Sequence, residues 1–244
     1  MNHRIPSRLL AGGLLLAGVV AAHYTWIAPA PLVLGKVNKV SIAHGHHFPM
    51  SEEAIVAAQV KAFAVAPSGK RIALSAVKAD KTVEADYTPS EAGTHTFGFV
   101  QDRGVLSRTP GGVKPGGRDV NKDATQALRV MRTAVAFGST AKVAPPGKPL
   151  GLELEIVPQV APSSVTLQLL RLGKPLAATA IQVLTSGSEE PKDLGKTSAQ
   201  GTLVYAIGVG TKPPVLFIAT VAEPAAKGAS YDTTNLSTSL YLSW

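Results

Sequence analysis

The stretch TVEADYTPSEAGTHTFGFV, residues 82–100, decides the fold class of this protein. Polar and apolar residues alternate on both sides of the segment PSEAG (residues 89–93), which is the period of two that β-strands show. After that segment, His95, Phe97 and Phe99 fall on one face of the second strand. Proline and glycine supply the backbone angles of a turn between the strands. The stretch therefore predicts two β-strands joined by a turn.

Short alternating segments separated by Pro/Gly turns recur along the whole chain. They occupy residues 36–48, 57–80, 150–160, 163–187, 196–208, 213–223 and 238–244. Turn residues about every ten positions are typical of immunoglobulin-like β-sandwiches. We therefore predict an all-β protein with two sandwich domains in tandem, residues 23–143 and residues 148–244. The Gly/Pro-rich residues 138–149 are the predicted linker.

The composition agrees with this fold class. The chain of 244 residues has 23 Gly and 18 Pro and only 16% charged residues, which is unusual for a helix-rich protein. It has no cysteine, so the core must stabilise the fold without disulfides, alone or with a metal. The net charge is +8, but Lys and Arg are scattered rather than clustered. We therefore expect no nucleic-acid partner.

Two segments depart from the alternation. Residues 101–126 are rich in Gly, Pro and Arg and lack a period, which predicts a long irregular loop and a candidate lid. Residues 124–138 are ambiguous, because Leu128, Met131 and Val135 have a helical spacing whereas the end of the segment favours a strand.

The N-terminus has the pattern of a secretory signal peptide, predicted over residues 1–22. Arg4 and Arg8 precede an uncharged apolar run at residues 9–22, which is too short to cross a membrane. Cleavage after Ala22 would make His23 the first residue of the mature protein. We therefore expect an exported, periplasmic protein that is soluble and not stably inserted in the membrane after processing.

The segment SIAHGHHFPM, residues 41–50, contains three of the six histidines of the chain. A spacing of two places His44 and His46 on one strand face, where two imidazoles can bind one ion. Neutral imidazole is a good ligand for nickel, cobalt, copper and zinc. His47 points the other way and joins only if the chain bends near Pro49.

His23 and His95 complete the set of candidate metal ligands. As the first residue of the processed chain, His23 offers its α-amine and its imidazole to one ion, a histidine brace that suits nickel or copper. His95 begins a strand and is the weakest candidate. Glu52 and Glu53 follow the histidines closely, but their pattern favours solvated side chains over oxygen ligands.

The sequence predicts a protein that is not an enzyme. It has no GxSxG or HExxH motif, no cysteine nucleophile and no P-loop. The Gly-rich segment GGVKPGG, residues 111–117, lacks the strand-to-helix context that phosphate binding requires.

The second half of the chain resembles the carboxypeptidase-regulatory and prealbumin-like modules. The resemblance lies in GKPLAATAIQV (residues 173–183) and TSAQGTLVYAI (residues 197–207). It implies a prealbumin-like β-sandwich with a structural or docking role.

The whole mature chain resembles a family of exported proteins that are often labelled periplasmic components of cobalt or nickel uptake systems. AHYTWIAP (residues 22–29) is similar to the family's Ala-His-aromatic opening, and AHGHHFP (residues 43–49) is similar to its Gly-His-x-Phe segment. The resemblance places His46 on the motif histidine and adds weight to His23.

Three functions follow as hypotheses. The first is a periplasmic protein that binds nickel or cobalt and delivers the ion to a membrane metal transporter. The second keeps the site but binds copper, as a carrier or a histidine-brace protein. The third is a metal-free envelope protein that binds a glycan or a protein partner.

Overall fold

The computed structural model describes residues 23–140, 147–188, 190–208 and 211–243. The predicted signal peptide and residues 141–146 of the predicted linker lie outside these residues. None of the described segments forms a helix long and apolar enough to cross a membrane.

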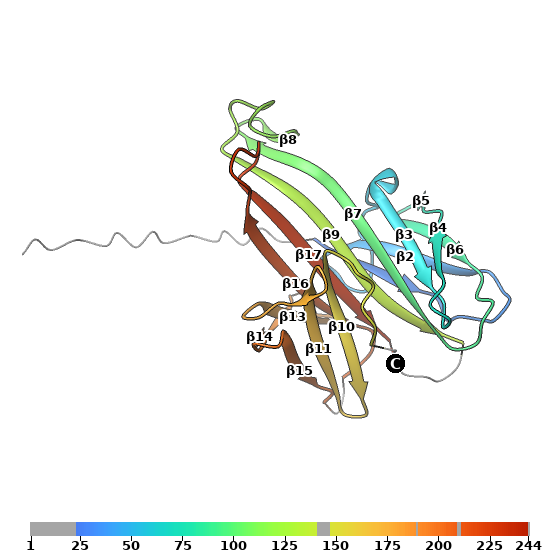
Figure 1. Ribbon diagram of the computed structural model, residues 1–244. Helices are drawn as coiled ribbons and strands as arrows, with labels where there is room; N and C mark the ends of the chain where they lie inside the picture. Colours follow the sequence, from blue (N-terminus) through green and yellow to red (C-terminus); the bar gives the residue numbers. More distant parts are fainter. Residues whose placement is uncertain (1–22, 141–146, 189, 209–210, 244) are drawn as a thin grey trace, which may run out of the picture.

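The described residues form β-strands and one 3-10 turn, η1 (Ala57–Gln59), so the prediction of an all-β fold is confirmed (Figure 1). The strands are β1 (Tyr24–Pro29), β2 (Asn38–Gly45), β3 (Val60–Val65), β4 (Arg71–Leu74), β5 (Val77–Ala79), β6 (Thr82–Tyr87), β7 (Thr94–Thr109), β8 (Gly112–Pro115), β9 (Gln126–Ser139), β10 (Leu154–Ala161), β11 (Ser164–Arg171), β12 (Lys174–Pro175), β13 (Ala180–Thr185), β14 (Lys192–Lys196), β15 (Thr202–Ala206), β16 (Val215–Pro224) and β17 (Thr233–Leu242).

The strands form one large sheet and two small ones. The large sheet, here called the central sheet, has the order β14-β13-β16-β17-β9-β7-β3-β4, with β8 paired to β7. The N-sheet has the order β1-β2-β6-β5. The C-sheet contains β10, β11 and β12, with β15 paired to β11. The central sheet therefore contains strands from both halves of the chain.

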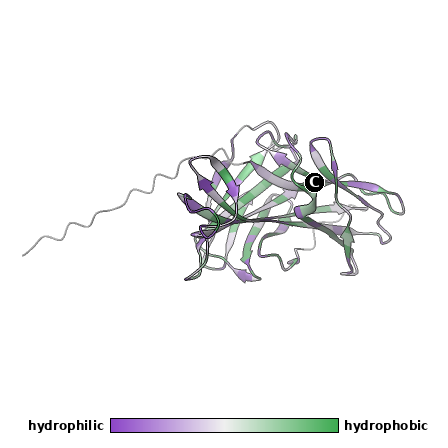
Figure 2. Ribbon diagram, turned by 90° about the horizontal axis from the view of Figure 1, so that it is seen from above, coloured by the Kyte–Doolittle hydropathy of each residue, from purple (hydrophilic) through white to green (hydrophobic). Residues whose placement is uncertain are grey.

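The two small sheets cover opposite faces of the central sheet. Ala134 and Ala136 of β9 point into a core with Ile42 and Val83 of the N-sheet. Val135, between them, points into a second core with the residues of the C-sheet. Because successive side chains of a strand point to opposite faces, β9 serves both cores. The buried apolar residues of these two cores lie between the layers. In Figure 2, hydrophilic residues are frequent in the loops at the strand ends.

A parallel pairing of β9 with β17 joins the two halves. The register places Leu128 opposite Thr233 and Ala136 opposite Tyr241. The two predicted sandwiches thus share one continuous sheet. This pairing brings together residues about a hundred positions apart, so no local sequence pattern could predict it.

The prediction of an irregular loop over residues 101–126 is wrong for most of its length. β7 continues to Thr109 and pairs with β9 as far as Arg108, with one register shift after Asp102. The helical alternative for residues 124–138 is also wrong, because β9 is a strand throughout. The long β9 gives the polar residues of β7 a ladder of hydrogen-bond partners that the local pattern does not reveal.

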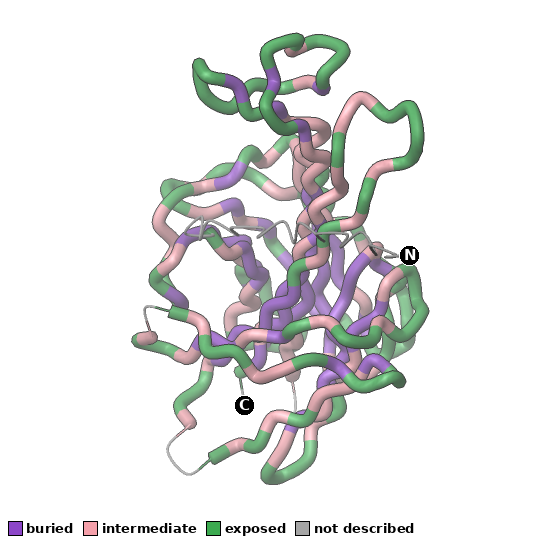
Figure 3. The backbone as a smooth tube through the Cα atoms, turned by 90° about the vertical axis from the view of Figure 1, so that its left-hand side faces the viewer, coloured by how far each residue is buried: buried purple, intermediate pink, exposed green. Residues whose placement is uncertain are grey.

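The tip beyond β7 is an exposed hairpin fixed to the loop that joins β16 to β17 (Figure 3). The Arg118 guanidinium pairs with the Asp232 carboxylate at 2.8 Å and donates to the carbonyl oxygens of Ala124 and Thr125. The Gly-rich residues 111–117 therefore belong to this hairpin tip. The tip is docked on residues 230–232 and is not placed as a lid over the histidines.

The strand β1 lies between the two halves and positions the functional site. Its Ile27 side chain is fully buried in the core between the N-sheet and the central sheet. The neighbouring Trp26 faces the other way and packs with Leu184, Leu216 and Ile218 of the second half. Both faces of β1 are therefore anchored, and the residues at its start are held in a fixed place.

Candidate functional site

The antiparallel pairing of β1 with β2 brings His23 to the histidines of residues 44–47. Tyr24 lies opposite Gly45, and Thr25 lies opposite His44. His23 directly precedes β1 and therefore lies beside the end of β2. Its ring centroid is 3.9 Å from that of His46 and 4.9 Å from that of His44. The structure thus gathers three of the predicted ligands.

The loop after β2 folds back on the strand that it leaves. The backbone N–H of Glu52 donates to the carbonyl oxygen of His44 at 2.9 Å, and the Ser51 hydroxyl accepts from the backbone N–H of His44 at 3.0 Å. Phe48 anchors the loop, because it is buried with its ring edge-on to Trp26 at 5.4 Å. This return places Glu52 and Glu53 against the histidines.

The structure brings Glu52 and Glu53 beside the histidines, although Glu53 keeps 62% of its side chain exposed. The Nε2 atom of His23 lies 3.8 Å from an oxygen of each carboxylate. His23, His44, His46, Glu52 and Glu53 are here called the histidine–glutamate cluster. The only sequence signal for the two glutamates was their nearness to the histidines, because the loop that turns them inward depends on the tertiary packing of Phe48.

His44 is buried and is held through one ring nitrogen. Its Nδ1 atom is 2.7 Å from the hydroxyl of Thr25, and its Nε2 atom is 3.6 Å from an oxygen of Glu53. Burial lowers the pKa of His44 to about 3, and the positive charge of Arg132 acts in the same direction. His44 is therefore neutral near pH 7, the form in which imidazole binds metals.

His46 has the same arrangement with a different partner. Its Nδ1 atom is 3.2 Å from an oxygen of Glu52. Its Nε2 atom is buried and has no hydrogen-bond partner among the described residues. A buried polar atom without a partner is unfavourable, and native proteins rarely contain one without a functional reason.

His47 lies at the edge of the cluster. Its side chain is exposed, and its Nδ1 atom is in a short hydrogen bond with the Glu52 carboxylate. That bond is the main cause that lowers the pKa of Glu52 to about 2, so this carboxylate is ionised. The structure therefore gives His47 the role of fixing Glu52.

His95 lies apart from the other histidines. Its Nδ1 atom is 2.8 Å from the Tyr87 hydroxyl, and its Nε2 atom is 3.0 Å from the carbonyl oxygen of Glu91. Tyr87 pairs with Asn38 at the start of β2, whereas His44 is six residues further along. At about 3.3 Å per residue, His95 is therefore roughly 20 Å from the cluster. Both of its ring nitrogens already have protein partners.

The cluster contains two overlapping groups of possible ligands. His23, His46 and Glu52 form one group, His23, His44 and Glu53 form the other, and the ligand atoms of each group lie within 4.8 Å of one another. Two ligands of one transition metal ion lie roughly 3 to 4 Å apart. Small side-chain movements are therefore enough for either group to close on an ion.

The ring orientations also match those of metal-binding histidines. Such histidines commonly bind the ion through one ring nitrogen while the other is held by a carboxylate, carbonyl or hydroxyl oxygen. Thr25 holds Nδ1 of His44 and Glu52 holds Nδ1 of His46, so both residues present Nε2. Imidazole nitrogens with one or two carboxylate oxygens suit nickel, cobalt, copper and zinc better than calcium or magnesium.

Comparisons with known proteins identify the family of the chain. None of the curated proteins is significantly similar to it in sequence. The two-domain fibronectin type III segment of chicken tenascin is a similar solved structure, with 13% identity, 88% of this chain and 97% of that chain covered, and a TM-score of 0.23. Residues 20–210 match the family described as "Domain of unknown function (DUF4198)", and the chain belongs to this family.

Proposed function

We propose that this protein is an exported, periplasmic carrier that binds nickel or cobalt and delivers the ion to a membrane metal transporter. The ion is bound by Nε2 of His23, His44 and His46 and by a carboxylate oxygen of Glu53. Glu52 holds His46 in place, and His47 holds Glu52.

The observation that carries this proposal is the buried Nε2 atom of His46, which has no partner among the described residues. The ring of His23 stands 3.9 Å from the His46 ring, and Glu52 accepts at the opposite nitrogen of His46. A metal ion bound there supplies the missing partner. A structural histidine would have both nitrogens satisfied, as His95 has.

The charges of the cluster also favour a divalent cation. Two carboxylates, Glu52 and Glu53, lie within 4 Å of histidine ring nitrogens. Together they offset the charge of a divalent ion, whereas two adjacent carboxylates without a cation repel each other. A neutral His44 adds a nitrogen ligand without adding a proton that must be displaced.

The position of the cluster suits a carrier. His23 and Glu53 have side-chain exposures of 39% and 62%, whereas that of His44 is 7%. The ion would therefore be reached from one side, through exposed ligands that can turn away during transfer. The resemblance to components of nickel and cobalt uptake systems supplies the partner class, a membrane importer.

Copper is the alternative cargo, and the position of His23 supports this alternative. This residue belongs to both ligand groups. If processing ends at Ala22, the α-amine of His23 becomes an additional nitrogen ligand beside its imidazole, and such nitrogen-rich sites bind copper strongly.

The test is calorimetric titration of the exported protein, with its N-terminal residue determined, against Ni²⁺, Co²⁺, Cu²⁺ and Zn²⁺. A second version carries one extra residue before His23. Tight binding of nickel or cobalt supports the carrier. A selective loss of copper binding in the extended version identifies the α-amine as a ligand and favours the copper alternative.

His47→Ala is the matched control, because it removes an imidazole from the same loop without removing a proposed ligand. We expect it to change metal affinity only a few-fold, through Glu52. Failure of both versions to bind any of the four metals would contradict the proposal and leave the metal-free binding protein.

A further inference from the structure

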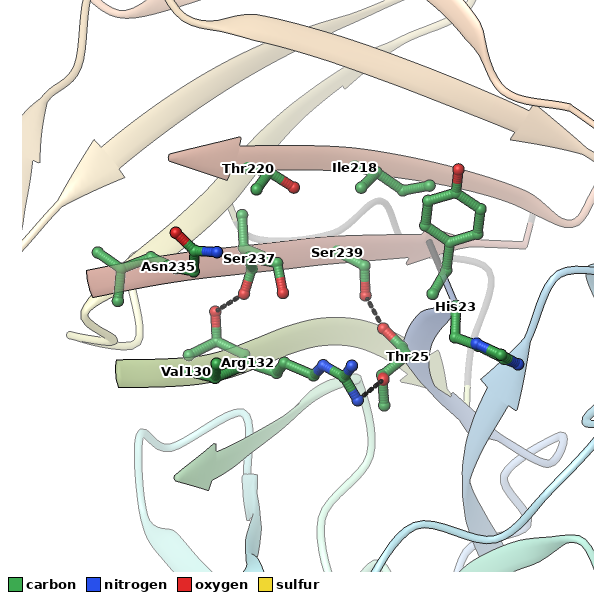
Figure 4. A pocket seen from close by; sticks show the side chains of 13 residues that line it. His23, Thr25, Val130, Arg132, Ile218, Thr220, Asn235, Ser237 and Ser239 are labelled. Atoms are coloured by element: carbon green, nitrogen blue, oxygen red, sulfur yellow. Dashed lines mark hydrogen bonds between the residues drawn. The ribbon is translucent and has the colours of Figure 1, made fainter. Parts of the chain in front are cut away.

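A cavity of about 300 Å³ lies directly beside the histidine–glutamate cluster. Figure 4 shows that its floor is made by side chains of β9, β16 and β17, with the start of β1 beside them. The lining residues are His23, Tyr24, Thr25, Val130, Arg132, Thr133, Ile218, Thr220, Asn235, Leu236, Ser237, Thr238 and Ser239. None of the lining residues that the structure describes is acidic. Its volume is at the lower end of the range for small-molecule sites.

The strand registers bring polar groups to one level of the floor. Ser237 of β17 lies opposite Arg132 of β9 and opposite Thr220 of β16. Side chains of directly opposite residues project from the same face of a sheet. A guanidinium and two hydroxyl groups therefore face the cavity side by side, at a level of the central sheet that the N-sheet leaves uncovered.

Arg132 is the one arginine or lysine in this lining and forms no salt bridge with the described residues, although the Glu53 carboxylate lies near enough to raise its pKa. The only hydrogen bond of the Arg132 side chain to the described residues is a long one, from its Nη1 atom to the Thr25 hydroxyl at 3.5 Å. Arg118, Arg129 and Arg171 differ, because each has a carboxylate oxygen within 2.8 to 3.2 Å. Arg132 is half-buried, and burial lowers its pKa to about 10, with the positive charge of Arg103 acting in the same direction and the Glu53 carboxylate acting against both. An unpaired cation in such a place is unfavourable until an anion binds.

Three other polar side chains of the floor can bind the same anion. Ser239 is not one of them, because its hydroxyl donates to the carbonyl oxygen of Thr25 at 2.7 Å. The side chains of Ser237, Thr220 and Asn235 have no hydrogen-bond partner within the described part of the chain. They offer neutral donors around the guanidinium, an arrangement typical of an oxyanion site.

The cavity is connected to the cluster through two residues. His23 belongs to the lining and to both ligand groups. The Thr25 hydroxyl contacts Nη1 of Arg132 on one side and Nδ1 of His44 on the other. A ligand seated on Arg132 therefore lies next to the ligands of the ion.

We propose that this cavity binds a small carboxylate anion, with the Arg132 guanidinium as its counter-ion and Ser237, Thr220 and Asn235 as neutral donors. The flat guanidinium can donate two parallel hydrogen bonds to one carboxylate group. One cation in the lining balances the single charge of a carboxylate rather than the double charge of phosphate. The inference rests on the proposed function only in its second part, that metal and carboxylate are bound together.

The test is calorimetric titration of the metal-free and the nickel-loaded protein with the monocarboxylates acetate and propionate, and with inorganic phosphate and chloride for comparison. We expect carboxylate binding to the metal-free protein that Arg132→Met weakens roughly tenfold or more. Ser237→Ala should weaken it about threefold. Nickel should strengthen it at least about fivefold, if both ligands meet at His23.

Arg129→Met is the matched control, because it removes an arginine from the opposite face of the same strand and should change carboxylate affinity less than about twofold. If Arg132→Met does not fold, the inference is tested by the carboxylate affinity of Ser237→Ala and by the order in which the unaltered protein prefers the anions. Absence of carboxylate binding, equal loss in the Arg129 variant, or a preference for phosphate or chloride would overturn the inference. Carboxylate binding that depends on Arg132 in a protein that binds no metal would uphold the cavity and reject the proposed metal carrier.

Discussion

His46, which follows β2 of the N-sheet, and His95, which lies on β7 of the central sheet, show how differently the same side chain can be used. His95 is fully buried, and both of its ring nitrogens have protein partners, the Tyr87 hydroxyl and the Glu91 carbonyl oxygen. His46 has one nitrogen held by Glu52 and the other buried without a partner in the described part of the chain. The number of satisfied ring nitrogens, rather than burial, separates a structural histidine from a candidate metal ligand.

The largest effect is expected from His46→Ala. Loss of a ligand whose Nε2 completes the site should lower the affinity for nickel roughly a hundredfold or more. The free energy of unfolding should change by less than about 1 kcal/mol, because the removed contact with Glu52 is partly exposed. Titration of the variant beside thermal unfolding of the metal-free protein checks both parts. Unchanged nickel affinity would remove the distinction between the two histidines.

His95→Ala should have the opposite signature. It leaves the Tyr87 hydroxyl and the Glu91 carbonyl oxygen without their partner, so the protein should lose about 2 kcal/mol of stability. That loss corresponds to a fall in Tm of roughly 4 to 8 °C for a chain of this size. Nickel affinity of the folded variant should stay unchanged, and a loss comparable to that of His46→Ala would show that the site extends to His95.

Gly45→Ala probes the loop that brings Glu52 to the cluster. A Cβ atom at residue 45 would lie 2.8 Å from Cγ and 3.1 Å from Cβ of Glu52, so this side chain must shift. Removing the group that orients a ligand histidine typically weakens metal binding about tenfold. Gly35→Ala is the control, because it also adds a Cβ atom at a positive φ, +70°, but this atom meets nothing within 4 Å, so the variant reports backbone strain without displacing Glu52. Equal affinities of the two variants would contradict the orienting role of Glu52.

Glu91→Gln, close to His95, should give the smallest effect on stability. The Ser68 hydroxyl donates to the Glu91 carboxylate at 2.8 Å, and this bond is the first cause that lowers the pKa of Glu91 below its ordinary 4.5. A lowered pKa in the folded state stabilises the protein above pH 4.5, and the gain is lost as the pH falls through the folded-state value. The variant should therefore have a slightly lower Tm at pH 7, and the difference should shrink as the pH falls below 4.5. A difference that does not change with pH would rule out ionisation as its source.

Part of the site was predictable because the residues that form it are close in sequence. A spacing of two puts His44 and His46 together whatever the rest of the fold does, and the resemblance in AHYTWIAP pointed to His23. The position of His95 was not predictable, because it depends on the register of β7 against β9. The sequence did not predict Glu53 as a metal ligand, because the loop that turns back on β2 brings it to the histidines. It did not predict a role for Arg132, because that role depends on a face of the central sheet that the N-sheet leaves uncovered. Neither feature has a sequence pattern.

The amino-acid sequence by itself determined the all-β class and most of the strands, because alternation and turn residues act over a few positions. It did not determine that β9 pairs in parallel with β17, so that two sandwiches share one sheet. It also did not determine the extension of β7 through a segment rich in Gly and Pro. Those features depend on partners that are distant in the chain, and only tertiary packing decides which distant strand supplies the hydrogen bonds and buried surface.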